Sequence, residues 1–229
     1  MVPAGVPASD ADPGTTTIER LEAAEIARPA WVVLPAATAD KPLGVLVYCA
    51  PPTGVAGGGT PVRDAEVDAA AKRLAERWKG AATRYGVAVV LPLPSDPNRW
   101  GREDVANLAR SLDTLRLRRP IDATRVAFAG SGAGGAFAWL AADALGPAVR
   151  GVALLDATLP RQATIEPTEP GRSRAVLFGS SPGAAVGRVD DDRRRLDAAG
   201  YPVGLLPELA GDPIPAETLC SWVETLGVF

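Results

Sequence analysis

One serine stands inside a glycine-rich stretch near the middle of the chain. Residues 125–139 read RVAFAGSGAGGAFAW, in which a short apolar run leads to four glycines with Ser131 among them. Glycine permits positive φ angles and a close approach of backbones, so the stretch predicts a strand, a very tight turn and a helix packed close behind it. A turn of this kind presents one side chain above a sheet, where a serine hydroxyl would act as a nucleophile.

A serine nucleophile needs a general base, and the chain contains no histidine. Histidine is the usual base because its pKa lies near neutrality, and it is also the commonest neutral metal ligand. Lysine can replace it, but Lys41, Lys72 and Lys79 belong to an early loop and to the first long predicted helix. A catalytic Ser131 therefore requires a rearranged site or a histidine supplied by a partner chain.

Carboxylates and one tryptophan follow the predicted strands. Asp156 ends a strand at the edge where α/β folds bind ligands, and an acidic rim would form there together with Asp96, Glu208 and Asp212. Carboxylates alone do not define a cation site, and acids on loops are ordinarily solvated or capping residues, so we predict no metal site. Trp100, in DPNRW, either lines a cleft at this edge or anchors the core.

Composition limits the kinds of partner. The chain has 229 residues, of which 47% are hydrophobic, and a net charge of -3, which suits one large core. We expect a linker-like segment over residues 1–15 and a single domain over residues 16–229. No basic cluster is interleaved with aromatic residues, as nucleic-acid binding would require, and no apolar run approaches the roughly 20 residues of a membrane span. No targeting signal is visible, so the compartment stays open.

Apolar runs alternate with amphipathic stretches along the chain. Strands are expected over residues 31–34, 43–50, 87–94, 125–129, 149–156, 174–179 and 201–209. Residues 15–27 are ambiguous: they contain good helix formers, and only the family resemblance given below makes them a first strand. Helices are expected over residues 62–84, 102–116, 134–145, 189–200 and 215–226. This alternation indicates βαβ units, and hence a three-layer α/β/α sandwich with a mainly parallel, doubly wound sheet. The two cysteines, Cys49 and Cys220, are interpreted as buried free thiols.

The order of these elements resembles a minimal α/β-hydrolase. The usual elbow pattern of that family, Arg-Val-x-x-x-Gly-x-Ser-x-Gly-Gly, lies on residues 125–135 without a gap. The similarity covers roughly residues 31–229 and is also carried by WVVLP, LGVLVYCAPPTG, DPNRW, VALLDATLP and AAGYPV. The chain looks most like the compact carboxylesterase and polyhydroxyalkanoate-depolymerase-like group, without a cap domain. It is similar in particular to degenerate hydrolase-like modules that follow PDZ or protease domains in large bacterial proteins.

The resemblance carries the family's catalytic triad onto positions that hold other residues. In the elbow register the nucleophile position is Gly132, and Ser131 takes the variable position before it. The family's acid, in the loop before the penultimate helix, corresponds to Pro182, and its histidine, before the last helix, corresponds to Asp212. A register shifted by one residue gives Ala-x-Ser-x-Ala across residues 129–133 and would make Ser131 a fallback nucleophile.

The oxyanion hole of the family uses the amide after the nucleophile and an amide of the loop after the central strand. Ala133 corresponds to the first of these. In the loop, Pro51 and Pro52 have no N–H to donate, which leaves Thr53 and Gly54 as the nearest donors. One missing donor costs on the order of 10²-fold in rate, so this loop weakens a catalytic interpretation.

The glycines also admit a nucleotide-binding interpretation. Gly130, Gly132 and Gly135 satisfy G-x-G-x-x-G, and Asp156 lies near the expected acid spacing, but a dinucleotide fingerprint opens the first βαβ unit whereas this one falls in mid-chain. The glycine run over residues 54–61 lacks the Lys-Ser/Thr of a phosphate loop. We expect no cofactor.

The sequence therefore predicts a catalytically inactive α/β-hydrolase-like domain that serves as a binding or scaffold module in a larger protein. Its expected partners are upstream domains of the same polypeptide and a small-molecule or peptide ligand in a vestigial cleft; nucleic acid and a membrane span are not expected. The alternatives are a serine esterase with a rearranged site around Ser131 and a purely structural packing module. The connection after Asp156 is short for a cap domain, so the site should be shallow.

Overall fold

The computed structural model of the chain describes residues 15–22, 28–36, 41–52, 64–168, 174–182, 186–206, 209 and 214–228. Four residues singled out in the sequence lie outside the described residues, namely Thr53, Gly54, Glu208 and Asp212. The other predicted site residues, from Trp100 to Pro182, are all described.

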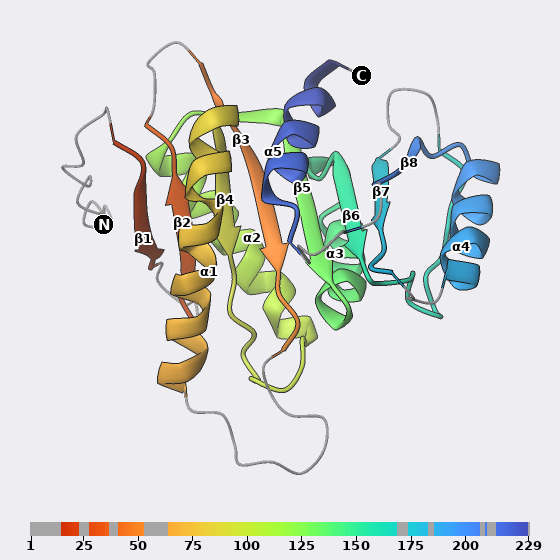
Figure 1. The fold of residues 1–229 in the computed structure, drawn as a ribbon, viewed down its shortest axis with the longest axis horizontal. Coiled ribbons are helices and arrows are strands. Elements are labelled where there is room, and N and C mark those ends of the chain that lie inside the picture. Colours follow the sequence, from red (N-terminus) through yellow and green to blue (C-terminus); the bar gives the residue numbers. More distant parts are fainter. Residues whose placement is uncertain are drawn as a thin grey trace, which may run out of the picture.

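Within the described ranges, eight strands form one sheet in the order β1-β2-β4-β3-β5-β6-β7-β8 (Figure 1). The six strands β3 to β8 are all parallel to one another. Strand β2 is antiparallel to both of its neighbours, β1 and β4. The strands are β1 Thr17–Leu21, β2 Ala30–Leu34, β3 Leu43–Cys49, β4 Val87–Leu91, β5 Ile121–Ser131, β6 Gly151–Leu155, β7 Ala175–Gly179 and β8 Val203–Leu205. The prediction of a mainly parallel sheet is confirmed.

Helices cover both faces of this sheet (Figure 1). Helices α1 and α5 pack against each other on one face, and α2, α3 and α4 contribute to the core on the other face. The helices are α1 Asp64–Tyr85, α2 Arg102–Arg118, α3 Ala133–Leu145, α4 Val186–Ala198 and α5 Ala216–Thr225, with short 3-10 turns at Gly146–Ala148 and Leu226–Val228. The expected three-layer arrangement is confirmed.

The central strands are apolar along their whole length because helices cover them on both sides. Every residue of β3, β4 and β6 is buried. Two cores result, one on each face of the sheet. Cys49 lies in the core under α2 and α3, Cys220 lies in the core under α1 and α5, and both are free and buried, as predicted.

The largest differences from the expected boundaries occur at β4, β5 and β8, and β5 spans Ile121–Ser131 instead of residues 125–129. Strand β4 ends before the prolines of residues 92–94, and β8 has three residues instead of the nine expected over 201–209. Proline has no N–H to donate to a strand ladder, and Pro202 directly precedes β8. In the described part of the chain, the helices are too short or too polar to cross a membrane.

Candidate functional site

Strand β5 passes into helix α3 through a turn at a single residue, Gly132. Ser131 ends β5, Ala133 begins α3, and Gly132 between them has φ 52° and ψ -122°. The Gly132 N–H donates to the Leu155 carbonyl of β6 at 2.9 Å, and the Gly132 carbonyl accepts from the Gly135 amide at 3.1 Å. The tight elbow expected from the glycine pattern is present, and Gly132 forms its tip.

Two other residues of this stretch must be glycine because close packing leaves no space for a side chain, not because of their backbone angles. A Cβ atom on Gly134 would lie 2.1 Å from the carbonyl oxygen of Cys49, and a Cβ atom on Gly130 would lie 2.5 Å from the carbonyl of Gly134. A Cβ atom on Gly132 would meet no heavy atom of the described residues within 4 Å. Helix α3 is therefore held close against β3 and β5, while the tip of the turn has room for a side chain.

Ser131 lies beside the tip with its hydroxyl already engaged. Its Oγ lies 2.6 Å from the hydroxyl of Tyr48 on β3, in a hydrogen bond between residues 83 positions apart. Tyr48 is 1% exposed, and its ring contacts Trp78 of α1 at a centroid distance of 5.2 Å. The Ser131 side chain is thus linked through Tyr48 to the packing between the sheet and α1.

Two of the lysines considered as general bases are engaged elsewhere. The Lys41 ammonium lies 3.6 Å from Glu224, and the Lys72 ammonium lies 5.6 Å from the ring centre of Trp31 on β2. Lys41 precedes the amino end of β3, whereas Ser131 lies at the carboxyl end of β5, and the Lys72 contact on β2 is separated from β5 by β4 and β3, so neither lysine is positioned beside Ser131.

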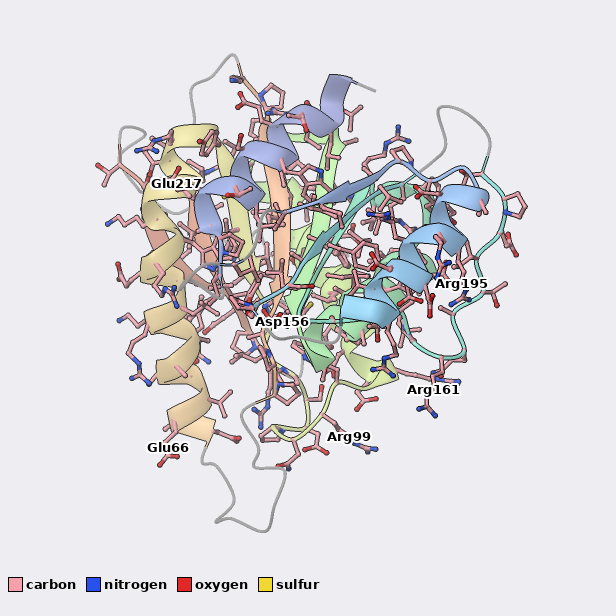
Figure 2. The ribbon with its side chains drawn as sticks, turned by 45° about the vertical axis from the view of Figure 1, so that its right-hand side comes forward. Glu66, Arg99, Asp156, Arg161, Arg195 and Glu217 are labelled. Atoms are coloured by element: carbon pink, nitrogen blue, oxygen red, sulfur yellow. The ribbon has the colours of Figure 1, made fainter. Side chains whose placement is uncertain are left out.

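Asp156 follows β6 at the edge of the sheet that carries the elbow (Figure 2). It has φ 46°, an angle that residues other than glycine rarely adopt. Its carboxylate accepts from the Ser181 amide and from the Ser181 hydroxyl, both at 2.6 Å. Pro182, at the position predicted for the acid, follows in an exposed turn. The structure therefore brings Gly132, Asp156 and Pro182 to one edge, where Asp156 ties the ends of β6 and β7 together.

Asp96, the other described acid of the predicted rim, forms hydrogen bonds within its own loop. Asp96 accepts from the Asn98 amide at 2.9 Å and from the Arg99 Nε at 3.1 Å. The hydrogen bond from the Asn98 amide holds the pKa of Asp96 below its usual value. Among the described residues, no group of three or more histidine, cysteine or acidic side chains is arranged to hold a metal ion.

Trp100 connects the loop after β4 to the elbow helix. Its ring stacks on Phe137 of α3 with a centroid distance of 4.5 Å and an interplanar angle of 8°. Its Nε1 donates to the carbonyl of Ala50, directly after β3, at 3.0 Å. Trp100 therefore anchors this loop against α3, and it also lines an apolar cavity beside α1.

The loop after β4 is held from below by a buried carboxylate. Asp104, in the first turn of α2, is 1% exposed. It accepts from the Ser95 amide at 2.8 Å, the Ser95 hydroxyl at 2.7 Å and the Gly101 amide at 2.7 Å. These bonds fix both ends of residues 95–101, and therefore fix where Trp100 stands.

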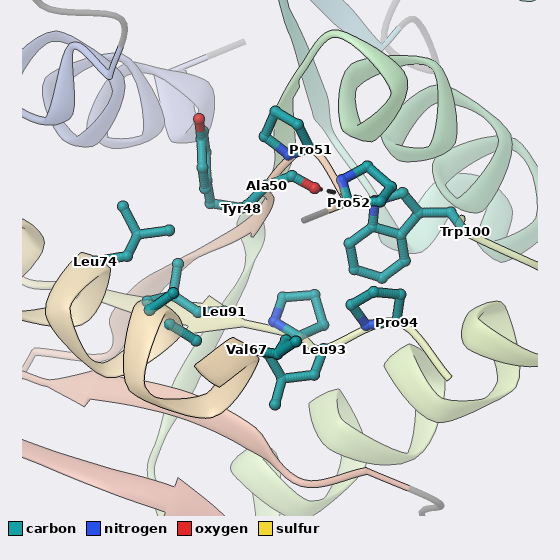
Figure 3. Close-up of a pocket in the computed structure, with 13 residues that line it drawn as sticks. Tyr48, Ala50, Pro51, Pro52, Val67, Leu74, Leu91, Leu93, Pro94 and Trp100 are labelled. Atoms are coloured by element: carbon teal, nitrogen blue, oxygen red, sulfur yellow. Dashed lines mark hydrogen bonds between the residues drawn. The ribbon is translucent and has the colours of Figure 1, made fainter. Parts of the chain in front are cut away.

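An apolar cavity of about 90 Å³ lies between α1 and the carboxyl ends of β3 and β4 (Figure 3). It is lined by Tyr48, Ala50, Pro51, Pro52, Val67, Ala70, Ala71, Leu74, Leu91, Pro92, Leu93, Pro94 and Trp100. The Tyr48 ring forms one wall, and the Tyr48 hydroxyl binds Ser131. One side chain therefore separates this cavity from the elbow.

Sequence reasoning did not single out Tyr48, Phe137 or Asp104. Asp104 has a partial signal, because an acid in the first turn of a helix is a common capping feature, and its own amide bonds back to the Gly101 carbonyl at 3.2 Å. Tyr48 has no such signal in the sequence. Its hydrogen bond to Ser131 depends on the register in which β3 pairs with β5, where Tyr48 lies opposite Ala129.

No protein-family model and no curated protein matches the chain. Solved structures do resemble it. An S-formylglutathione hydrolase from Staphylococcus aureus has a TM-score of 0.60 at 14% identity, over 98% of this chain and 99% of that chain. A fungal esterase from Rhizomucor miehei has a TM-score of 0.59 at 15% identity, over 96% of this chain and 87% of that chain. Esterase 2 from Thermogutta terrifontis has a TM-score of 0.58 at 13% identity, over 96% of each chain.

Identities this low support a common fold and no more. The strand order, the elbow between β5 and α3, and the coverage of these neighbours agree with one another. The chain has the α/β-hydrolase fold, and the solved structures that it resembles are esterases and other serine hydrolases.

Proposed function

We propose that this chain is an α/β-hydrolase-fold domain without serine-hydrolase activity, which keeps the fold as a binding or scaffold module. The observation that carries the proposal is the tip of the elbow. In this fold the nucleophile stands at that tip, and here the tip is Gly132, at φ 52°, with no side chain. Ser131 belongs to the strand, and its hydroxyl is bonded to Tyr48.

The remaining catalytic positions support the same proposal. The chain has no histidine to act as a base. The loop after β7 offers Pro182 in the position of the acid, and Pro51 and Pro52 remove two amides from the loop that would bind an oxyanion. Ser131 would therefore lack a histidine base and would have fewer backbone amides to stabilise an oxyanion.

The test is ester hydrolysis and covalent labelling of the purified chain. We expect no labelling by a fluorophosphonate probe, and hydrolysis of millimolar p-nitrophenyl acetate and butyrate no faster than in Ser131→Ala. Ser181→Ala is the matched control, since it removes another serine hydroxyl from the same edge of the sheet. The Staphylococcus aureus protein described as a fluorophosphonate-binding serine hydrolase is a suitable positive control. Turnover that Ser131→Ala abolishes and Ser181→Ala retains would overturn the proposal.

A second candidate function is that of a serine esterase built on Ser131. The short bond between Ser131 and Tyr48 favours it, since an ionised tyrosine can accept a serine proton, and the fold neighbours are esterases. Against it, an ionised phenolate among apolar side chains is costly, and Tyr48 is buried. This candidate predicts that Tyr48→Phe removes turnover as completely as Ser131→Ala does.

We further infer that residues 16–229 act as one domain beside others in a larger polypeptide. The linker-like composition of residues 1–15 and the resemblance to modules that follow PDZ or protease domains support this inference. Limited proteolysis should leave one stable fragment that begins near residue 16. If the native upstream domains supply the missing base, fluorophosphonate labelling will appear only when those domains are present.

A further inference from the structure

We propose that the cavity between α1, β3 and β4 is a binding site for a short, uncharged hydrocarbon group of a small molecule. This inference rests on the proposed function, because it names the ligand of a domain that binds without catalysis. The cavity is separate from the elbow tip, since the Tyr48 ring stands between the cavity and Ser131.

The size of the cavity limits its ligand. Its volume is about 90 Å³. An apolar cavity of about 150 Å³ in another protein accepts a benzene ring. The cavity described here therefore suits an aliphatic group of about four carbons rather than an aromatic ring.

The chemistry of the walls excludes a charged group. None of the described residues that line the cavity is charged, and they include the aliphatic side chains of Val67, Leu74, Leu91 and Leu93. The two polar side-chain atoms nearby are already bonded, the Tyr48 hydroxyl to Ser131 and the Trp100 Nε1 to Ala50. An ion in this cavity would lose its hydration without gaining a partner.

Prolines make the rim equally poor in donors. Four of the lining residues are prolines, from the segments after β3 and β4, namely Pro51, Pro52, Pro92 and Pro94. Proline has no backbone N–H, so the rim offers a carboxylate or a phosphate fewer amides than an ordinary loop would. An uncharged ligand loses nothing by this deficit, because its hydrocarbon group requires no donor.

The walls are rigid before any ligand arrives. Proline restricts φ, Trp100 is clamped between Phe137 and the Ala50 carbonyl, and Asp104 holds the loop that carries Trp100. A preformed apolar pocket binds without the entropic cost of ordering its own side chains.

The experiment titrates ethanol, 1-propanol, 1-butanol, 1-hexanol and 1-octanol into the chain and follows the Trp100 indole N–H by ¹H–¹⁵N NMR. Loss of that signal in Trp100→Phe assigns it among the five tryptophans. We expect affinity to rise about fourfold for each added methylene up to 1-butanol and to level off beyond it. Butanoate and butylammonium should bind several-fold more weakly than 1-butanol.

Two neighbouring positions on α1 give a matched pair of variants. Ala70 lines the cavity and Ala69 does not, while both are half-buried. Ala70→Leu should fill the cavity and weaken 1-butanol binding at least tenfold, whereas Ala69→Leu should leave it unchanged. Leu74→Ala is a second variant, which should enlarge the cavity and move the best chain length to 1-hexanol or beyond.

The outcomes separate this inference from the proposed function. No shift of the Trp100 signal with any alcohol, or a shift that persists in Ala70→Leu, overturns the inference. Tighter binding of butanoate than of 1-butanol also overturns it. The same samples are assayed for p-nitrophenyl butyrate hydrolysis: alcohol binding together with Ser131-dependent turnover supports the cavity but overturns the proposal that the domain is inactive.

Discussion

At the scale of single residues, the elbow glycines serve two different needs. Gly134 has no room for a side chain, since its Cβ would lie 2.1 Å from the Cys49 carbonyl oxygen. Gly132 has room, and only its φ of 52° disfavours another residue. The packing of α3 against the sheet therefore tolerates a side chain at the position where hydrolases carry their nucleophile, although this chain has none there.

The same substitution at both glycines tests this difference. Gly132→Ser should cost about 1–3 kcal/mol of stability through its backbone angle, whereas Gly134→Ser should cost about 3 kcal/mol or more because it forces α3 away from β3. Urea denaturation followed by circular dichroism measures both. Gly132→Ser should also hydrolyse p-nitrophenyl esters no faster than the parent chain, because no histidine is available. Equal destabilisation by the two substitutions would contradict the packing argument.

The hydroxyl pair of Tyr48 and Ser131 is expected to contribute to stability rather than to turnover. Ser131→Ala and Tyr48→Phe should each cost about 0.5–1.5 kcal/mol, because each removes the hydrogen bond between the two hydroxyls. The double variant should cost less than the sum of the two, with a coupling of about 0.5–1.5 kcal/mol in a double-mutant cycle. Strict additivity would mean that the bond contributes nothing to the native state.

At the scale of elements, the loop between β4 and α2 depends on one residue of the helix that follows it. Asp104 uses one oxygen for both Ser95 groups and the other for the Gly101 amide. The loop then carries Trp100 across to α3 and to the end of β3. A helix N-terminus thus positions the wall of a cavity that is otherwise built from α1 and two strand ends.

Asp104→Asn should destabilise the chain by about 1–3 kcal/mol, because an amide group would face either the Gly101 N–H or the Ser95 N–H and leave a buried donor unpaired. It should also speed the hydrogen exchange of the Trp100 indole N–H. Asp113→Asn is the control on the same helix: its side chain is 70% exposed and pairs with Arg116, so a change within about 0.5 kcal/mol is expected. An unchanged exchange rate in Asp104→Asn would show that the loop holds without this carboxylate.

At the scale of the whole molecule, the sheet separates two cores that each contain one thiol. Burial raises the pKa of Cys220 to about 12 and raises the pKa of Cys49 further, with a smaller contribution from the charge of Asp104 to the latter. The thiolate is the reactive form, so neither cysteine should react while both faces of the sheet stay covered.

We therefore expect Ellman's reagent at pH 8 to modify neither cysteine of the native chain and both cysteines in guanidinium chloride. Since the folded pKa values are raised above the unfolded ones, stability should also fall as the pH rises above about 9, where unfolded thiols ionise and native ones do not. Cys49→Ala and Cys220→Ala assign the two thiols. Rapid modification of one thiol in the native chain would mean that its core opens locally.

Much of this fold was predictable from the sequence because its signals are local. Apolar runs indicated the buried strands, helical periodicity indicated the helices, and the glycine spacing of residues 130–135 indicated the elbow. The boundaries that were wrong at the ends of β4 and around β8 are those where prolines interrupt an apolar run, whereas β5 begins earlier than expected because residues 121–124 do not form an apolar run. Around these prolines the residues remain apolar, but the prolines have no N–H to donate to a neighbouring strand.

The sequence by itself determined that this chain has no histidine, that residues 130–135 form a glycine-rich elbow, and that its strands alternate with helices. Tertiary structure alone decided that the Tyr48 hydroxyl binds Ser131, that Asp104 holds the Trp100 loop, and that a cavity remains beside α1. For the Tyr48–Ser131 bond the physical reason is distance along the chain: periodicity acts over a few residues, whereas the pairing of β3 with β5 brings together two hydroxyl groups 83 positions apart.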